Sequence, residues 1–73
     1  MKNITDISDL ELGKYYQVWE QGLAEWHDDY EYVGYDVITD DHIFRSIVGP
    51  FSTSFYFMSV SRNDVLDMVR FAD

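Results

Sequence analysis

Two mirrored triplets carry the residue types best suited to chemistry, His27-Asp28-Asp29 and Asp40-Asp41-His42. Imidazoles and carboxylates bind metal ions and can act as general acids or bases. Residues 30–39 between them alternate in polarity, which predicts a strand, and a strand of that length separates the triplets by about 30 Å. Either triplet alone offers too few ligands for zinc, and the spacing of a calcium loop is absent. We therefore predict no metal site and no cofactor, and interpret both triplets as exposed polar loops.

The sequence also lacks the motifs of common catalytic sites. It has no cysteine, which excludes thiol chemistry. None of the patterns GxSxG, P-loop, GxGxxG or HExxH occurs. A β domain of 73 residues has little room for an enclosed ligand cleft of about 300 Å³. We therefore expect a protein that is not an enzyme.

Acidic residues are concentrated in the middle of the chain. The sequence holds 14 Asp and Glu against 5 Lys and Arg, a formal net charge of −9, and no Lys or Arg occurs between Lys14 and Arg45. This charge repels nucleic acid and anionic membranes, and it attracts basic protein surfaces. The acids form either a docking surface for a basic protein or a solvated surface that discourages edge pairing. The candidate contact acids are Glu25, Asp28, Asp29, Glu31, Asp36, Asp40 and Asp41.

Large aromatic residues stand among these acids. Trp26, Tyr30 and Tyr32 lie beside them in the sequence, and Tyr and Trp are enriched at the energetic centres of protein interfaces. We take these three as candidate anchors for a partner. Other apolar residues are assigned to the core on strand periodicity. They are Tyr16, Val18, Val33, Tyr35, Val37, Phe55 and Phe57.

Four stretches have the β-branched and aromatic content of strands. They are residues 14–19, 30–39, 42–48 and 55–60. Asp40-Asp41 is interpreted as a two-residue hairpin turn, because Asp tolerates turn conformations. Residues 20–29 and 49–54 are interpreted as loops, with a helical turn possible around residues 23–26.

Both ends of the chain show helical spacing. Ile4, Ile7 and Leu10 recur every three residues, as in one helical turn packed on the domain or in a loosely docked arm. Near the other end, Ser61 followed by Asp64 is a weak capping box. It predicts that residues 61–72 form a short helix, or a helical turn that leads into a short strand at 69–72.

The order of these elements predicts a mostly β, antiparallel fold of four or five strands with a short C-terminal helix, in a single domain over residues 1–73. The segments LELGKYYQV (10–18) and SVSRNDVLDMVRF (59–71) resemble the opening and the ending of a small SH3-like barrel. The competing architecture is an open antiparallel sheet with the helix across one face.

The sequence gives no sign of membrane targeting. The N-terminal residues lack a continuous apolar stretch, and no apolar run approaches the about 20 residues that span a bilayer. We expect a cytoplasmic protein.

In size, acidity and lack of motifs, the chain resembles the small early proteins with which bacteriophages block host defences, such as anti-restriction and anti-CRISPR proteins. Immunity proteins and antitoxins share these traits. The resemblance implies a non-catalytic inhibitor whose partner is a basic protein, such as a nuclease or another nucleic-acid-binding protein. Its carboxylates would imitate the phosphates of a nucleic acid, without direct nucleic-acid or membrane binding. A phage-encoded chain would act in the host cytoplasm.

Two other functions fit the same residues. One is an SH3-like interaction module or assembly subunit that binds through an aromatic groove or a sheet edge. The other is a homo-oligomer, such as a homodimer, joined by the surplus aromatics Phe51, Phe55 and Tyr56. Binding by the acidic surface should weaken strongly in salt, whereas groove or edge binding should not.

Overall fold

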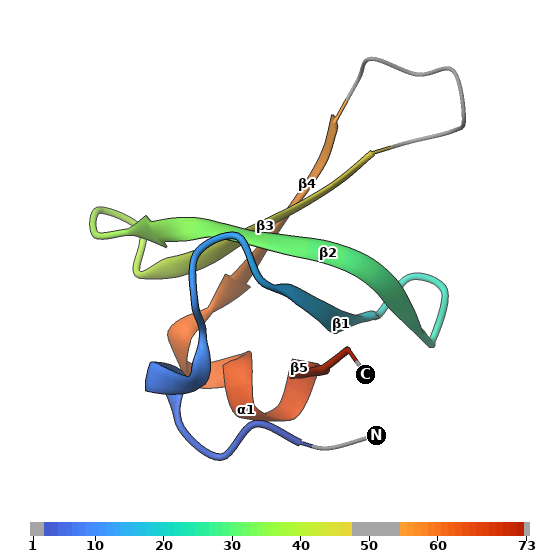
Figure 1. Cartoon of the computed structure of the whole chain (residues 1–73), viewed down its shortest axis with the longest axis horizontal. Coiled ribbons are helices and arrows are strands. Elements are labelled where there is room, and N and C mark those ends of the chain that lie inside the picture. Colours follow the sequence, from blue (N-terminus) through green and yellow to red (C-terminus); the bar gives the residue numbers. More distant parts are fainter. Residues whose placement is uncertain (1–2, 48–54, 73) are drawn as a thin grey trace.

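The computed structural model describes residues 3–47 and 55–72, so the predicted loop at 49–54 lies outside the described residues. Five strands make up most of this part of the chain (Figure 1). They are β1 (Tyr15–Glu20), β2 (Glu25–Asp36), β3 (Asp41–Ile47), β4 (Phe55–Ser61) and β5 (Val69–Phe71). Three short helical segments complete the fold, namely η1 (Ile7–Asp9), η2 (Arg62–Asp64) and α1 (Val65–Met68).

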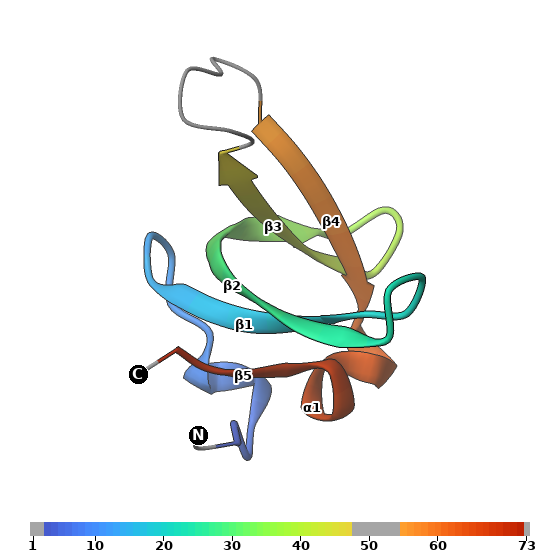
Figure 2. The same ribbon diagram turned by 90° about the vertical axis from the view of Figure 1, so that its right-hand side faces the viewer.

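The strands form one antiparallel sheet in the order β4-β3-β2-β1-β5. The sheet is strongly curved but open, so the predicted mostly β, antiparallel fold with a short C-terminal helix is confirmed, and the closed barrel is not formed. The C-terminal segment follows the second of its two predicted forms, a helical turn that leads into a short strand, β5. Figure 2 shows η1 and α1 gathered on the same side of the sheet, beside β5.

The core lies on the face of the sheet that η1 and α1 cover. Tyr16 and Val18 of β1 are fully buried, as predicted, and the Tyr16 ring meets Phe44 of β3 edge-on at 6.1 Å between centroids. Val60, Val65 and Val69 close the core from the C-terminal side. Alternating β-branched and aromatic side chains along each strand produce this single apolar layer.

The N-terminal segment is packed on the domain rather than loosely docked. Asp6 caps η1 by accepting a hydrogen bond from the Ser8 amide at 2.9 Å, and the Asp9 side chain accepts from the Asp6 amide at 3.3 Å. Ile4 is buried in the core. The hydroxyl of Tyr16 donates to the Asp9 carbonyl at 2.7 Å and fixes the end of η1 against β1.

Strand β2 is longer and more irregular than predicted. It begins at Glu25 instead of residue 30, and it carries two bulges. At the first, Asp28 and Asp29 together lie opposite Gln17. At the second, Val33 has no partner, because Tyr32 pairs with Phe44 and the next pair is Gly34 with Ile43.

The second bulge changes which residues of β2 share a face of the sheet. Tyr32 and Tyr35 now share a side of the sheet, because their partners Phe44 and His42 are two residues apart on β3. The expected core positions are partly wrong: Tyr35 and Phe57 are exposed and Val33 is only half-buried. Val37 is exposed because the strand has already ended. The side chain of Phe55 lies outside the described residues.

The turn between β2 and β3 also differs from the prediction. It contains the four residues Val37–Asp40, and Asp41 is already in β3. The Asp36 carboxylate accepts a hydrogen bond from the Ile38 amide at 2.9 Å, and Asp40 adopts the left-handed conformation with φ 60°. Asp tolerates both roles. Asp36 and Asp40 therefore stabilise the two ends of the turn, and its centre is formed by other residues.

Candidate protein-binding surface

Each of the first two hairpins is closed by a pair of acidic residues. Glu20 pairs with Glu25 at the end of the β1–β2 hairpin, and Asp36 pairs with Asp41 at the end of the β2–β3 hairpin. Like charges directly opposite each other on neighbouring strands are destabilising. At the first pair, the imidazole Nε2 of His27 lies 3.2 Å from Glu20 Oε2 and 2.9 Å from Glu25 Oε1. The His27 imidazole therefore lies within reach of both carboxylates of this pair.

The Asp36–Asp41 pair has no such neighbour. Among residues 3–47 and 55–72, no Lys, Arg or His nitrogen lies within 4.0 Å of either carboxylate. Asp36 is bonded to the Ile38 amide, and Asp41 makes no side-chain hydrogen bond within this part of the chain. Two half-buried negative charges are thus held side by side without a cation.

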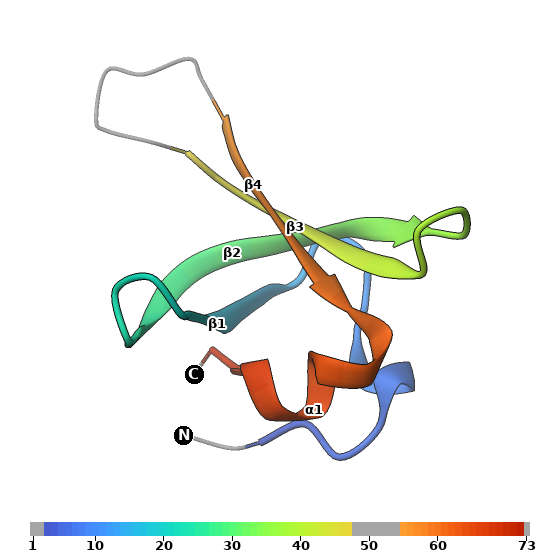
Figure 3. The same ribbon diagram turned by 180° about the vertical axis from the view of Figure 1, so that it is seen from behind.

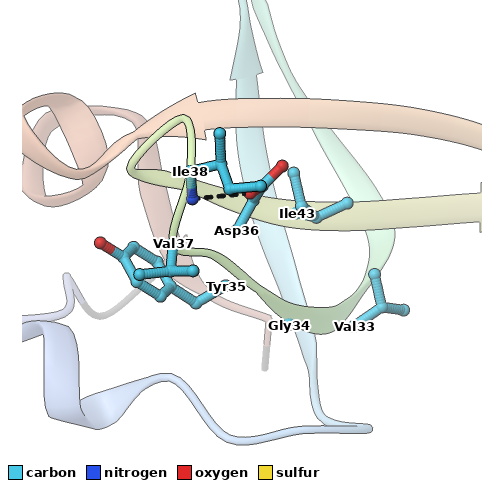
Figure 4. Close-up of a pocket in the computed structure, with 7 residues that line it drawn as sticks. All are labelled: Val33, Gly34, Tyr35, Asp36, Val37, Ile38 and Ile43. Carbon is cyan, nitrogen blue, oxygen red and sulfur yellow. Dashed lines mark hydrogen bonds between the residues drawn. The ribbon is translucent and has the colours of Figure 1, made fainter.

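An apolar concavity of about 430 Å³ lies beside these carboxylates, lined by residues of β2, β3 and their turn (Figure 4). Figure 4 shows Asp36 between Ile38 and Ile43, with the Ile38 amide directed at the Asp36 carboxylate. Val37 and Ile38 are 78% and 91% exposed, although both are β-branched apolar residues in a turn. We call Asp36, Val37, Ile38, Asp41 and Ile43 the acidic corner.

Asp40 belongs to a different set of contacts. Its carboxylate accepts a hydrogen bond from the Tyr35 hydroxyl and lies 3.4 Å from Nε of Arg62. The bond to Asp40 is the main cause that raises the pKa of Tyr35. Asp40 is therefore neutralised within the chain, unlike its neighbour Asp41.

Glu31 is also paired internally. Its Oε1 accepts a hydrogen bond from Nε of Arg45 at 3.0 Å, across the β2–β3 ladder. A second concavity of about 360 Å³ lies next to this pair and shares Val33 with the first. Glu31 pairs with Arg45 and Asp36 pairs with Asp41. Because Arg45 and Asp41 are an even number of residues apart on β3, Glu31 lies on the same face of the sheet as Asp36 and Asp41.

Asp28, Asp29 and Trp26 lie at the other end of β2. Asp28 accepts a hydrogen bond from the amide of Gln17, whose oxygen accepts one from Nη2 of Arg70 at 2.8 Å. The Arg70 guanidinium lies over the ring of Trp26 at 3.8 Å from its centroid. Asp29 occupies the bulge with φ 67° and is exposed. Here the half-buried Trp26 and the exposed Asp28 serve the packing of β5 on β1 and β2.

The structure corrects the prediction that Tyr30 and Tyr32 are surface anchors. Their side chains are 3% and 7% exposed and belong to the core. Burial, with the nearby Glu20 and Tyr56, raises the pKa of Tyr30 to about 12. Burial likewise raises the pKa of Tyr32, whose hydroxyl is bonded to His42. Neither ring is available to a partner in this fold.

The predicted acidic residues thus divide into separate groups and do not form one continuous edge. Glu25 lies at the β1–β2 turn with His27, and Asp28 and Asp29 lie at the first bulge. The outer face near the β2–β3 turn holds the remaining acids except Asp40. They are Glu31, Asp36 and Asp41.

The sequence pattern does not indicate the apolar half of the acidic corner, because it predicts Val37 in the core and Ile38 within the strand at residues 30–39. One signal could have indicated it. Val37-Ile38 stands between Asp36 and Asp40-Asp41, and Asp36 is placed to accept from an amide two residues ahead, as in an Asx turn. Such a turn would put both apolar side chains at a hairpin tip, in solvent.

Within the described residues, no group of three His, Asp or Glu side chains could hold a metal ion. In the same residues, no helix has the length and apolar character needed to cross a membrane. Comparisons with models of protein families, with curated proteins and with solved structures found no match for this chain. The fold and the acidic corner define the class of protein. It is a small open-sheet β protein with an unneutralised acidic surface beside exposed aliphatic side chains.

Proposed function

We propose that this chain is a non-catalytic inhibitor that binds a basic site of a nucleic-acid-handling protein through its acidic corner. The observation that supports this most is the opposed pair Asp36 and Asp41, which has no cation among the described residues. Such a pair costs stability in the free chain, and a cationic partner would relieve that cost. A site built for adjacent phosphates offers Lys or Arg at a similar spacing.

The apolar residues beside the acids provide the second part of the interface. Val37 and Ile38 are the most exposed large hydrophobic residues of the described chain, and Ile43 continues their surface. Protein interfaces combine an apolar centre with a charged rim that steers encounter. This is the mode of action expected of a small acidic counter-defence protein of phage type, in the cytoplasm of the host cell.

The test compares the wild-type chain with two charge-matched variants. Asp36→Asn/Asp41→Asn removes the opposed charges and retains the oxygen that accepts from the Ile38 amide. Asp64→Asn/Asp67→Asn removes the same number of charges from exposed positions in η2 and α1. Each immobilised chain is exposed to bacterial lysate at low and high salt, and captured proteins are identified by mass spectrometry.

The captured protein is then purified, and its binding to nucleic acid is measured in the presence of each soluble chain. The proposal predicts that the wild type and Asp64→Asn/Asp67→Asn displace the nucleic acid, whereas Asp36→Asn/Asp41→Asn does not. Displacement should weaken at high salt. Equal displacement by all three chains, or displacement that is unchanged at high salt, would refute the proposed function.

A further inference from the structure

The two edges of the sheet are protected to very different degrees. β5 is only three residues long, carries Arg70, and is bridged on its outer side by Asn3 of the N-terminal segment. β4 is seven residues long, and no described strand other than β3 pairs with it. An open strand edge offers unpaired backbone groups to another strand, and natural proteins usually blunt it with charges, proline or a short length.

β4 has none of these protections. Its sequence FYFMSVS contains no charged residue and no proline. Tyr56 and Phe57, on opposite faces of the strand, are 47% and 59% exposed. The β3–β4 ladder also continues past the last β2 pair, Glu31 with Arg45, to Ile47 with Phe55. Figure 3 shows β4 in front of β3 and β2, with no described element in front of it.

The side-chain order of β4 fits a second copy of itself. In an antiparallel pair centred on Met58, each aromatic residue faces a smaller one and Met58 faces Met58. Phe57 of one copy lies opposite Ser59 of the other, and Tyr56 lies opposite Val60. Such a pair also places no like charges across the ladder, although each chain carries a net charge of −9.

We propose that β4 pairs antiparallel with β4 of a second copy about a two-fold axis at Met58, which joins two sheets edge to edge. This interface is separate from the acidic corner and does not depend on the proposed function. The two associations have opposite responses to salt. Screening of the mutual repulsion of two acidic chains strengthens the dimer, whereas the same screening weakens binding to a basic partner.

The test is sedimentation equilibrium of the full chain over a dilution series, at low and high salt. The wild type should form a concentration-dependent dimer that is tighter at high salt. Ser59→Lys puts an ammonium opposite Phe57 of the other copy and should weaken the dimer at least ~30-fold, or about 2 kcal/mol. Asn63→Lys makes the same charge change at an exposed position outside β4 and should leave the dimer intact. Circular dichroism confirms that each variant is folded.

A second measurement tests the register, and the cysteine-free sequence makes it simple. Met58→Cys should form an intermolecular disulfide on mild oxidation, because the two sulfurs would meet at the axis, and Asn63→Cys should not. A wild type that stays monomeric throughout the series overturns the proposal and leaves the edge to a strand of another protein. A dimer that Ser59→Lys and Asn63→Lys affect equally, or that Met58→Cys does not cross-link, also overturns it.

Discussion

The hydroxyl of Tyr32 lies 2.8 Å from Nδ1 of His42 within the core, where the His42 side chain is only 4% exposed. The other ring nitrogen, Nε2, is buried without a hydrogen-bond partner among the described residues. The ring of Tyr35 also packs on the imidazole, at 4.9 Å between ring centroids. His42 therefore sits in an aromatic setting that favours its neutral form.

This pair predicts a loss of stability in mild acid. Burial is the main cause that lowers the pKa of His42 below its usual 6.5; Arg62 lowers it further, and Asp40 and Asp41 oppose the shift. The unfolded chain binds the proton first, so stability is retained above pH 6.5 and decreases as the pH falls from there through the folded pKa. The slope is at most about 1.4 kcal/mol per pH unit.

Urea unfolding between pH 7 and pH 5 measures this effect against a matched variant. Tyr32→Phe/His42→Phe replaces both partners of the hydrogen bond, which is often close to neutral for stability, and removes the titrating group. As the pH falls, the unfolding free energy of the wild type should decrease relative to that of the variant. A difference that stays constant over this range would contradict the account.

Two adjacent tyrosines of β1 should differ sharply in their contribution to stability. The Tyr16 hydroxyl donates to the Asp9 carbonyl and accepts from the Glu11 amide at 2.9 Å, so it holds the N-terminal segment on the sheet. Tyr16→Phe leaves both backbone groups unpaired and should cost about 1–3 kcal/mol in urea unfolding. The exposed Tyr15 is the control, and Tyr15→Phe should change stability by less than about 0.5 kcal/mol. Equal effects of the two substitutions would be inconsistent with this anchoring role.

The acidic corner should lower the unfolding free energy of the unbound chain. Asp36→Asn/Asp41→Asn should raise the unfolding free energy by about 0.2–1 kcal/mol at low salt, because it removes two opposed charges. The gain should shrink in ~1 M salt, where the screening length is about 3 Å. Asp64→Asn/Asp67→Asn controls for the change in net charge and should gain less. If the control gains as much, the opposition of Asp36 and Asp41 has no special cost.

The sequence suggests that reversal of Asp28, Asp29 and Glu31 to Lys would spare stability, and the structure indicates the contrary. Lys at position 29 must adopt φ near 67°, which costs about 1–2 kcal/mol. Lys at position 31 would also face Arg45. The triple variant should therefore have a lower melting temperature, measured at high salt so that the change in net charge is screened.

The control for that variant keeps the two outer reversals and places Gly at position 29. Glycine adopts positive φ without strain, so this variant should melt at a higher temperature than the triple variant, although still below the wild type. If the triple variant had the same melting temperature as the wild type, these acids would have no structural role. That result would restore the simpler interpretation of them as a free surface.

The antiparallel sheet could be predicted because most strands follow simple alternation, as in Tyr16 and Val18 of β1. The start of β2 could not, since Glu25 to Asp29 has the composition of a loop. Contacts with other strands make it a strand, such as Trp26 with Trp19 of β1 at 5.6 Å between ring centroids and with Arg70 of β5. Local propensity contains no information about such partners.

The candidate surface was predictable in its acids but not in its arrangement. The extra residue at Val33 puts Tyr32 on the same side of the sheet as Tyr35, and Tyr32 is buried beside Phe44 instead of exposed. Neither the bulge nor its position follows from periodicity, because a bulge is set by pairing with β3. The acidic corner consequently depends on the strand register that places Asp36 opposite Asp41, which the sequence does not give.

If the acidic corner contacts a basic partner, its backbone amides should respond when that partner binds. Chemical-shift mapping tests it most directly, with the ¹⁵N-labelled chain titrated by the protein captured from lysate. The account predicts that the largest amide perturbations occur at Val37, Ile38, Asp41 and Ile43, and that they weaken as salt is added. Perturbations confined to η2, α1 and β5, with the β2–β3 turn unchanged, would contradict it.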